Sequence, residues 1–525
     1  MRKIAGLRRP LRSKGQGRIS SIESRQAPVK GWNARDPIAA MKPGDAIILD
    51  DMFPMPNDIM LRKGIVAHVT GIGDQVESLM PYNNPDGTQT LFCAAGNEFY
   101  DVTSAGAVGS AVVSTLTNAR WQHNNFTNSS GDSYLCCFNG VDNPRYWNGT
   151  SWIEITGVST PAITGLTPSD IVSSTTHMRR MWLVQKDTLK AWYLPVDAVG
   201  GAAAALDLSG IAKRGGYLMA IESWTIDSGA GLDDHWIAIT SEGEIIVYAG
   251  SDPSSANTWA IKGVWYIGSP IGRRCLIKFG GDILMILKNG VFPLSKALLS
   301  ASVDRTVAMT DKIDQAMNAA ASSHSSNFGW QLTSYTAENM LLLNVPITEG
   351  SSQHQYVMNT LTGAWCRFTG YEANCFEVFG DELYCGGNGV VSKAWSTFSD
   401  NGAGITGIGE TAFDYFSAKT KKSFKMVRPI LSTNGTPAVS IGIDIDYEDA
   451  DRLTTNTFTG IMAGLWGIAL WGIGLWGSGL QTIRNWIGVS EIGLCAATHI
   501  HIQAEGLEVH WQATDFLYEV GDGIV

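Results

Sequence analysis

One arrangement of apolar and polar positions returns through most of the chain up to about residue 400. A short apolar run meets a tight polar turn, and a second run that carries aromatic residues follows. Two clear cases are Leu91–Ala95 before a Gly-Asn turn and Tyr134–Phe138 before an Asn-Gly turn. Asn and Gly adopt positive φ at little cost, so such turns between apolar runs predict β-hairpins.

The hairpins recur at a regular spacing. Turns near residues 97, 140, 187, 243 and 289 lie 43, 47, 56 and 46 residues apart. A repeat of about 40–50 residues that holds four short strands has the length of one β-propeller blade. No fixed signature motif accompanies the repeat, and a pair of β-sandwiches is the alternative. The spacing favours an all-β fold built on a β-propeller of about six blades.

Composition and turn signals divide the chain into three parts. A flexible basic arm occupies residues 1–30, and the propeller-like repeats occupy 31–405. A smaller β-sandwich-like domain occupies 406–525. Alternatively, residues 31–75 join this second domain and not the propeller. Within the repeats, 304–322 predict a helix, because acids come early, Ala and Met follow, and Pro and Gly are absent.

Composition narrows the possible classes of protein. Apolar residues make up 44 % and charged residues 17 %, and the chain holds 58 Gly and 18 Trp. This much apolar surface excludes disorder of the whole chain, and this much Gly excludes a long coiled coil. No apolar run follows the basic start, so we expect no secretory signal. The eight cysteines form no CxxC pair, which predicts free, mostly buried thiols in a reducing cytoplasm.

The chain lacks the sequence motifs of the common enzyme classes. It contains no Walker loop, GxSxG elbow, HExxH helix or kinase set. The acids at 444–451 do not match an EF-hand loop, and His499 with His501 lacks a third zinc ligand. We expect these acids to be solvated and these histidines to be structural. We therefore expect no enzyme activity, no metal and no cofactor.

Charge is distributed unevenly along the chain. Residues 1–30 hold nine Lys or Arg and one acid, whereas the other 495 residues hold 29 bases and 48 acids. A basic arm on an acidic body is typical of a segment that binds nucleic acid or an acidic partner, and a solvated tail is the alternative. A second basic cluster begins the C-terminal domain. The candidates for contact with DNA or an adaptor protein are Arg2, Lys3, Arg8, Arg9, Arg12, Lys14, Lys419, Lys421, Lys422 and Lys425.

An uncharged segment at 461–480 contains Leu-Trp-Gly three times at a spacing of five residues. It is long enough to span a bilayer, but its six Gly weaken a helix, and the five-residue step places the Trp on different helix faces. We therefore predict an aromatic loop around Trp466, Trp471 and Trp476. A neighbouring subunit, a membrane or the chain's own fold would cover it.

Short blocks near the N-terminus resemble a known family. They are GWNARDP at 31–37, PGDA at 43–46, LDDMFP at 49–54 and LRKG at 61–64. Together with a weakly repeated β middle and a β-rich C-terminal part, they resemble the tail hub or nozzle proteins of short-tailed bacteriophages, also called packaged-DNA stabilisation proteins. Beyond these blocks the resemblance is one of layout. The Trp segment and the long basic arm depart from the family.

The resemblance implies a structural protein of the virion tail, assembled in the host cytoplasm as a ring of six copies. The ring would continue the portal and adaptor channel, retain packaged double-stranded DNA and conduct it at infection. Expected partners are the adaptor or head-to-tail connector ring, tail fibres or a tail needle that plugs the channel, and transiently the host membrane. A mostly apolar, Trp-rich surface would suit the ring interface. Two other functions remain open, a β-propeller protein that binds or cleaves carbohydrate and a membrane-interacting tail tip.

Overall fold

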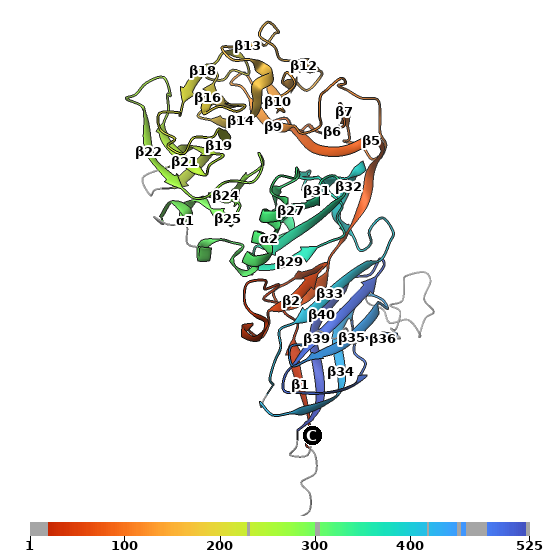
Figure 1. Cartoon of the computed structure of the whole chain (residues 1–525). Helices are drawn as coiled ribbons and strands as arrows, with labels where there is room; N and C mark the ends of the chain where they lie inside the picture. Colours follow the sequence, from red (N-terminus) through yellow and green to blue (C-terminus); the bar gives the residue numbers. More distant parts are fainter. Residues whose placement is uncertain are drawn as a thin grey trace, which may run out of the picture.

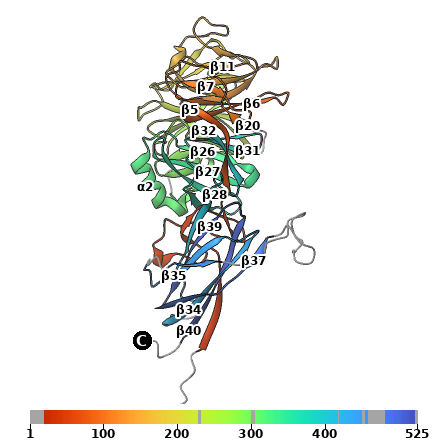
Figure 2. The same cartoon turned by 90° about the vertical axis from the view of Figure 1, so that its right-hand side faces the viewer.

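Short hairpins of buried apolar residues stack around a common axis in the first of two domains. The computed structural model describes residues 19–227, 232–299, 305–416, 419–448, 453–457 and 480–520. Figure 1 shows the ring of sheets above a second β domain, and Figure 2 shows the same two parts in line. The molecule is all-β with a propeller-like arrangement of sheets, as the hairpin spacing predicted.

Each blade is a small antiparallel sheet built mainly from strands consecutive in sequence. Blades one and two hold β5 (Gly64–Asn83), β6 (Gln89–Ala95) and β7 (Glu98–Asp101), then β9 (Gln122–Thr127), β10 (Ser133–Phe138), β11 (Arg145–Trp147) and β12 (Trp152–Glu154). Blades three and four hold β14 (Ile171–His177), β15 (Arg180–Gln185), β16 (Lys190–Tyr193) and β18 (Ala204–Asp207), then β19 (Leu218–Asp227), β20 (Leu232–Thr240), β21 (Glu244–Gly250) and β22 (Trp259–Tyr266). Blade five holds β23 (Leu276–Phe279), β24 (Asp282–Leu287) and β25 (Gly290–Pro293). Blades six and seven hold β26 (Gln331–Tyr335), β27 (Met340–Thr348), β28 (Ser352–Asn359) and β29 (Ala364–Phe368), then β30 (Cys375–Phe379), β31 (Glu382–Gly386) and β32 (Asn388–Thr397). The short strands β8 (Gly106–Ala107), β13 (Ile163–Thr164) and β17 (Gly201–Ala202) add parallel pairs.

The ring closes through β5, which serves two blades. Its first half pairs with β32 in blade seven, with Val69 opposite Val391, and its second half pairs with β6 in blade one, with Met80 opposite Phe92. A register shift beside Gly71, whose φ is +85°, separates the halves. Neighbouring blades contact one another around the whole ring. The described residues of the propeller therefore form seven blades, where the spacing predicted about six.

Tryptophans fill the space within and between blades. Trp182 of blade three packs on Trp236 and Trp259 of blade four, with ring centroids 4.8 and 5.4 Å apart. Trp121 meets Phe99 edge-on at 4.9 Å in the same way between blades two and one. None of the tryptophans that the structure describes is exposed. The expected Trp-rich surface is thus not found in the described part of the chain, because these large rings gain more from burial in the core.

The helical segment follows blade five. It contains α1 (Leu294–Leu299), the 3-10 turns η3 (Arg305–Val307) and η4 (Asp311–Ile313), and α2 (Asp314–His324). The helix expected at 304–322 is therefore present in its second half only. The backbone N–H of Met309 donates to the carbonyl of Val291, and the carbonyl of Met309 accepts from the Trp365 indole. These bonds to neighbouring elements replace helical ones. Other 3-10 turns are η1 (Ile38–Ala40), η2 (Pro168–Asp170) and η5 (Thr336–Glu338).

Two sheets form the second domain. One contains β3 (Met52–Pro54), β4 (Ile59–Leu61), β40 (Val509–Val520), β34 (Lys422–Thr433) and β37 (Gln481–Ile483), with β1 (Ile19–Gln26) beside β40 and β38 (Ile487–Gly493) beside β34. The other contains β2 (Ala46–Asp50), β33 (Ile405–Thr411), β39 (Ala496–Ala504), β35 (Ala438–Ile445) and β36 (Thr454–Thr457). The sheets meet where the buried Trp511 of β40 packs against Gly409 of β33, which has no side chain to obstruct the ring.

The sequence predicted that the arm ends at residue 30 and the propeller begins at residue 31, and the structure places both boundaries elsewhere. Residues 19–26 are not part of an arm, because β1 pairs with β40 along its whole length. Arg25 is matched inside the domain by ion pairs to Asp414 at 2.5 Å and to Glu23 at 2.8 Å. Strands β2, β3 and β4 also belong to the second domain, so the propeller begins at Gly64, in line with the alternative assignment of this region.

A nine-stranded sheet joins the two domains. Blade six continues through a parallel pairing of β29 with β2, at Arg367 and Asp50, into β33, β39, β35 and β36. The guanidinium Nε of Arg367 donates to Asp50 Oδ1 at 2.8 Å. Hydrogen bonding therefore runs without a break from the propeller into the second domain.

Arg62 lies beside this joint, and its side chain is only 2 % exposed. Its Nε donates to Asp51 at 2.5 Å, and its two terminal nitrogens donate to Asp400 at 2.9 and 2.6 Å. The guanidinium also lies 4.5 Å above the ring of Tyr371. Burial opposes the charge, but the hydrogen bond to Asp400 and the nearby carboxylates keep the pKa of Arg62 above its usual value. The LDDMFP and LRKG blocks thus build an ion-pair network between the domains.

Candidate functional site

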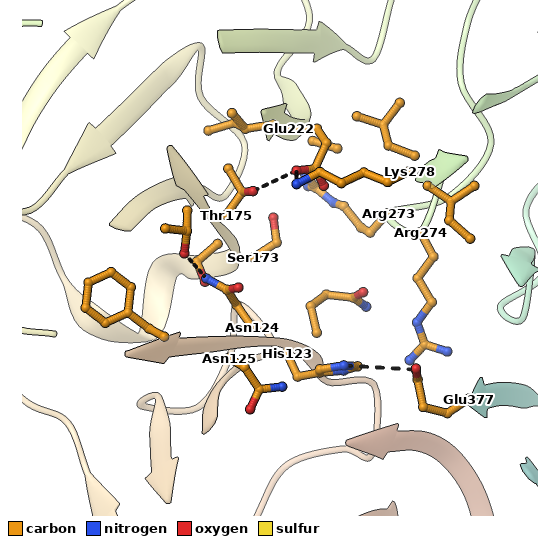
Figure 3. Close-up of a pocket in the computed structure, with 18 of the residues that line it drawn as sticks. His123, Asn124, Asn125, Ser173, Thr175, Glu222, Arg273, Arg274, Lys278 and Glu377 are labelled. Atoms are coloured by element: carbon orange, nitrogen blue, oxygen red, sulfur yellow. Dashed lines mark hydrogen bonds and ion pairs between the residues drawn. The ribbon is translucent and has the colours of Figure 1, made fainter. Parts of the chain in front are cut away.

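The propeller encloses a polar cavity on its axis. The cavity has a volume of about 870 Å³ and is lined by residues from all seven blades. Figure 3 shows side chains from several blades converging on it. The lining residues used below are His123, Asn124, Asn125, Ser173, Ser174, Thr175, Thr176, Glu222, Arg273, Arg274, Lys278, Thr333 and Glu377.

One wall carries a hydrogen-bonded chain from three successive blades. Thr175 of β14 donates its hydroxyl to Glu222 Oε1 at 3.0 Å, and Lys278 Nζ of β23 lies 3.1 Å from the same oxygen. The Lys278 side chain is 59 % exposed, whereas that of Glu222 is 20 % exposed. The carboxylate is thus held by the protein, and the ammonium keeps donors free for water or a ligand.

The facing wall holds an acid and a base whose pKa values are both shifted. His123 Nε2 of β9 lies 4.0 Å from Glu377 Oε2 of β30 (Figure 3). Burial raises the pKa of Glu377 to about 7. Burial and the charge of Arg274 lower the pKa of His123 to about 4. Both groups are therefore largely neutral near pH 6, although they lie within ion-pair distance.

Arg273 and Arg274 carry positive charge into the cavity wall. Arg273 donates to the carbonyls of Leu218 and Met219 at 2.8 and 3.1 Å. Arg274 donates to Ser78 Oγ at 2.7 Å and to nearby carbonyls. Neither guanidinium forms an ion pair with a carboxylate of the described chain, and burial lowers the pKa of both. The wall therefore holds two cations that lack a paired anion.

Hydroxyl and amide groups occupy much of the remaining lining. Asn124 Nδ2 donates to Thr176 Oγ1 at 3.1 Å, and Asn125 Nδ2 donates to the carbonyl of Pro81 at 2.8 Å. The hydroxyls of Ser174 and of Thr333, which is 6 % exposed, have no hydrogen-bond partner among the described residues. Both oxygens are enclosed by the protein and do not face the open space of the cavity.

Aromatic rings at this cavity do not offer a face for stacking. Trp121, Phe126 and Phe376 contribute to the lining but are 1, 3 and 1 % exposed. A sugar-binding cleft of the kind expected from the sequence needs acidic and aromatic residues together. The cavity supplies Glu222 and Glu377 but no accessible ring among these three residues.

The predicted basic candidates divide into three groups. Arg2, Lys3, Arg8, Arg9, Arg12 and Lys14 lie outside the described residues. Lys422 is fully buried and donates to the carbonyls of Thr420 and Leu494 at 3.1 and 3.0 Å, so it does not face DNA or another protein. It is buried because β34 begins there, between β40 and β38. Lys419, Lys421 and Lys425 are exposed.

The Trp segment also lies outside the described residues, including Trp466, Trp471 and Trp476. Within the ranges that the structure describes, no helix is long and apolar enough to cross a membrane. All eight cysteines are free and buried, as expected.

The acidic run and the histidines of the second domain meet on one sheet. Asp444 is 1 % exposed, and its Oδ2 lies 3.3 Å from His499 Nδ1. His499 and His501 have their Nε2 atoms 3.2 Å apart, on one strand face as expected. Asp444 is thus not solvated, because β35 places it beside β39 in the interior. In the described part of the chain no three His, Cys, Asp or Glu are placed to hold a metal ion.

Sequence reasoning did not find the axial cavity. Its lining comes from short polar runs that begin successive repeats, such as 122–125 and 173–176. Each run is unremarkable alone, and only ring closure brings them together. Polar runs at the start of several repeats are the signal that would have indicated the site.

Comparison with known proteins identifies no family. No family model and no curated protein matches the chain. Among solved structures it is similar to the extracellular domain of a hybrid two-component system from B. thetaiotaomicron, with 11 % identity, a TM-score of 0.38, and coverage of 63 % of this chain and 41 % of that one. It is also similar to Raptor from Chaetomium thermophilum (11 %, TM-score 0.37, 64 % and 29 % covered) and to YCF48 bound to D1 peptide (11 %, TM-score 0.32, 65 % and 93 % covered). The match thus spans less than half of the first two chains, and such likeness carries no information about activity.

Proposed function

We propose that this chain is the subunit of a ring that forms the nozzle or hub of a short-tailed phage tail. In this role it continues the portal and adaptor channel, retains packaged double-stranded DNA and conducts it at infection. The proposal rests on the resemblance of the N-terminal blocks to that family. No catalytic role is assigned to any residue.

The place where β1 begins is the structural observation that supports the proposal best. Ile19, the first residue that the structure describes, pairs with Val520 of β40 at the end of the second domain opposite the propeller (Figure 1). The residues that precede it in the sequence, 1–18, carry seven of the nine bases of residues 1–30 and no acid. Bases that adjoin the end of a domain in the sequence are suited to dock a neighbouring ring by electrostatic attraction.

The joint between the domains supports a role as a rigid wall. Hydrogen-bonded strands and the buried Arg62 network fix the propeller to the second domain. A conduit that retains DNA under pressure needs subunits whose domains do not swing. The LDDMFP and LRKG blocks, on which the resemblance rests, are the residues that build this joint.

Mass photometry of the purified full chain, with negative-stain images of the same sample, tests the ring. Six copies of 56.6 kDa give a species of about 340 kDa with a central hole, as expected of a closed cyclic assembly. A chain that stays monomeric at every concentration contradicts the self-assembled ring.

Deletion of residues 2–18 tests the docking role of the arm separately. Because it leaves β1 in place, we expect the ring to form and the docking to the adaptor to weaken. Normal tail assembly by this variant would contradict a docking role for the arm and leave the ring untouched.

A further inference from the structure

We propose that the axial cavity is a binding site for a small organic anion that carries hydroxyl groups, of the sugar acid or sugar phosphate kind. This inference does not depend on the ring or on the phage tail. It rests on the cations, the hydroxyls and the size of the cavity.

The positive charge of the cavity wall requires an anion. Arg273 and Arg274 are held by carbonyls and a hydroxyl, without an ion pair to a carboxylate of the described chain. Lys278 adds a third cation, with Glu222 as its partner. Buried or half-buried charges without counter-ions are costly, and a ligand anion would relieve that cost.

The acid on the facing wall does not cancel this charge near neutral pH. Glu377 interacts with the charge of Arg274 without forming an ion pair, and burial raises the pKa of Glu377 to about 7. The charged and titratable groups that face it are His123 of β9, which stays neutral, Arg274, and Glu77 of β5, whose pKa burial also raises. Below pH 7 the cations therefore outnumber the anions of the wall.

The neutral lining determines the rest of the ligand. Ser173, Thr176, Asn124 and Asn125 contribute hydroxyl and amide groups to the polar lining. Such groups hydrogen-bond to ligand hydroxyls in either direction. A volume of about 870 Å³ is within the usual range for a small-molecule site. Because no lining ring offers a stacking face, hydrogen bonds and charge would supply the binding.

Calorimetric titration of the full chain at pH 6.5 tests the proposal with four probes, glucuronate, glucose 6-phosphate, glucose and inorganic phosphate. We expect the two hydroxylated anions to bind at least about tenfold more tightly than glucose, because one charge-assisted hydrogen bond has that effect. If glucose binds as tightly as the anions, the ligand's charge is not recognised and the proposed anion is wrong. If phosphate binds as tightly as glucose 6-phosphate, the ligand's hydroxyl groups are not recognised. If neither hydroxylated anion gives heat, the cavity is not a binding site for such ligands.

Variants then locate the binding. Lys278→Gln removes a half-exposed cation and should weaken both anions about tenfold without unfolding the chain. Ser173→Ala, which removes a hydroxyl of the lining, should weaken them as well while conserving the fold. Lys262→Gln on β22, which lies outside the cavity, is the matched control. An equal loss in the control, or no loss in Lys278→Gln, places the binding elsewhere and overturns the assignment.

Discussion

At the scale of single residues, Arg62 joins the domains through charges that solvent barely reaches. Asp51 and Asp400 are acceptors for the same guanidinium, and Asp51 also accepts from the backbone N–H of Thr369 at 3.1 Å. Arg62→Met keeps an apolar stem but leaves both carboxylates without their cation. We expect it to lower the free energy of unfolding by about 3–5 kcal/mol, the cost of breaking a buried ion pair. Urea unfolding followed by tryptophan fluorescence measures the loss.

The matched control is Arg179→Met, because Arg179 is 67 % exposed and pairs with Asp197 near the surface. An exposed ion pair contributes less than about 1 kcal/mol. If both substitutions lower stability equally, the joint has no special energetic role.

Glu377 makes the stability of the fold depend on pH, and its raised pKa determines the direction of the change. Its pKa rises from an ordinary 4.5 to about 7 in the fold, because burial disfavours the carboxylate. The folded chain therefore binds one more proton than the unfolded chain between these values, and its stability falls as the pH rises through that window. Relative to Glu377→Gln, we expect the natural chain to lose about 2–3 kcal/mol of stability between pH 5 and pH 8.

The difference between the two proteins isolates this effect from other titrating groups. His123, whose pKa is lowered to about 4, acts in the opposite direction and is present in both. Urea unfolding at pH 5 and pH 8 provides the four values. Parallel pH profiles of the two proteins would show that Glu377 titrates normally.

At the scale of elements, β1 belongs to the second domain although its surroundings in sequence are basic. It forms the edge next to β40, and Arg25 lies 4.8 Å above the ring of Phe416. Deletion of residues 2–18 should leave the melting temperature unchanged. Deletion of 2–26 should lower it and promote aggregation, because it exposes the edge of β40 and leaves Asp414 without Arg25. Scanning fluorimetry with light scattering distinguishes them, and identical behaviour would show that β1 adds no stability.

The same elements show which parts of the fold the sequence could predict. Asn-Gly and Gly-Asn turns require positive φ, so hairpins such as those at 97 and 140 are local features that a pattern reveals. The blade number is not local, because β5 completes two blades through partners more than 300 residues apart, Val69 and Val391. Lys422 looked like part of an exposed basic stripe, but its burial depends on β38 and β40, which follow much later. The axial cavity was not predictable for the same reason, since its wall forms only when seven strands meet.

At the scale of the whole molecule, the outer face of the second domain exposes apolar side chains that a ring would cover. Ile22 of β1 is 61 % exposed and Ile492 of β38 is 51 % exposed. Across the four strands β1, β40, β34 and β38, one row of paired residues consists of Ser20, Glu519, Ser423 and Ile492. Residues paired in this way point to the same face of the sheet, and so does the residue two positions along a strand. Ile22 therefore shares the face of Ile492. Two exposed apolar residues on one sheet face make this face a candidate for the subunit interface.

If the proposed ring uses this face, the double substitution Ile22→Lys and Ile492→Lys should convert the species of about 340 kDa into 56.6 kDa monomers. Each interface would then bury unpaired charges, repeated around the ring, while both positions are exposed in the monomer and should leave its fold intact. Val158→Lys is the control, because Val158 is 95 % exposed and belongs to the propeller. Mass photometry compares the three proteins. A ring that survives the double substitution excludes this face as the contact. If Val158→Lys also disperses the ring, the loss is a general effect of added charge and does not locate the interface.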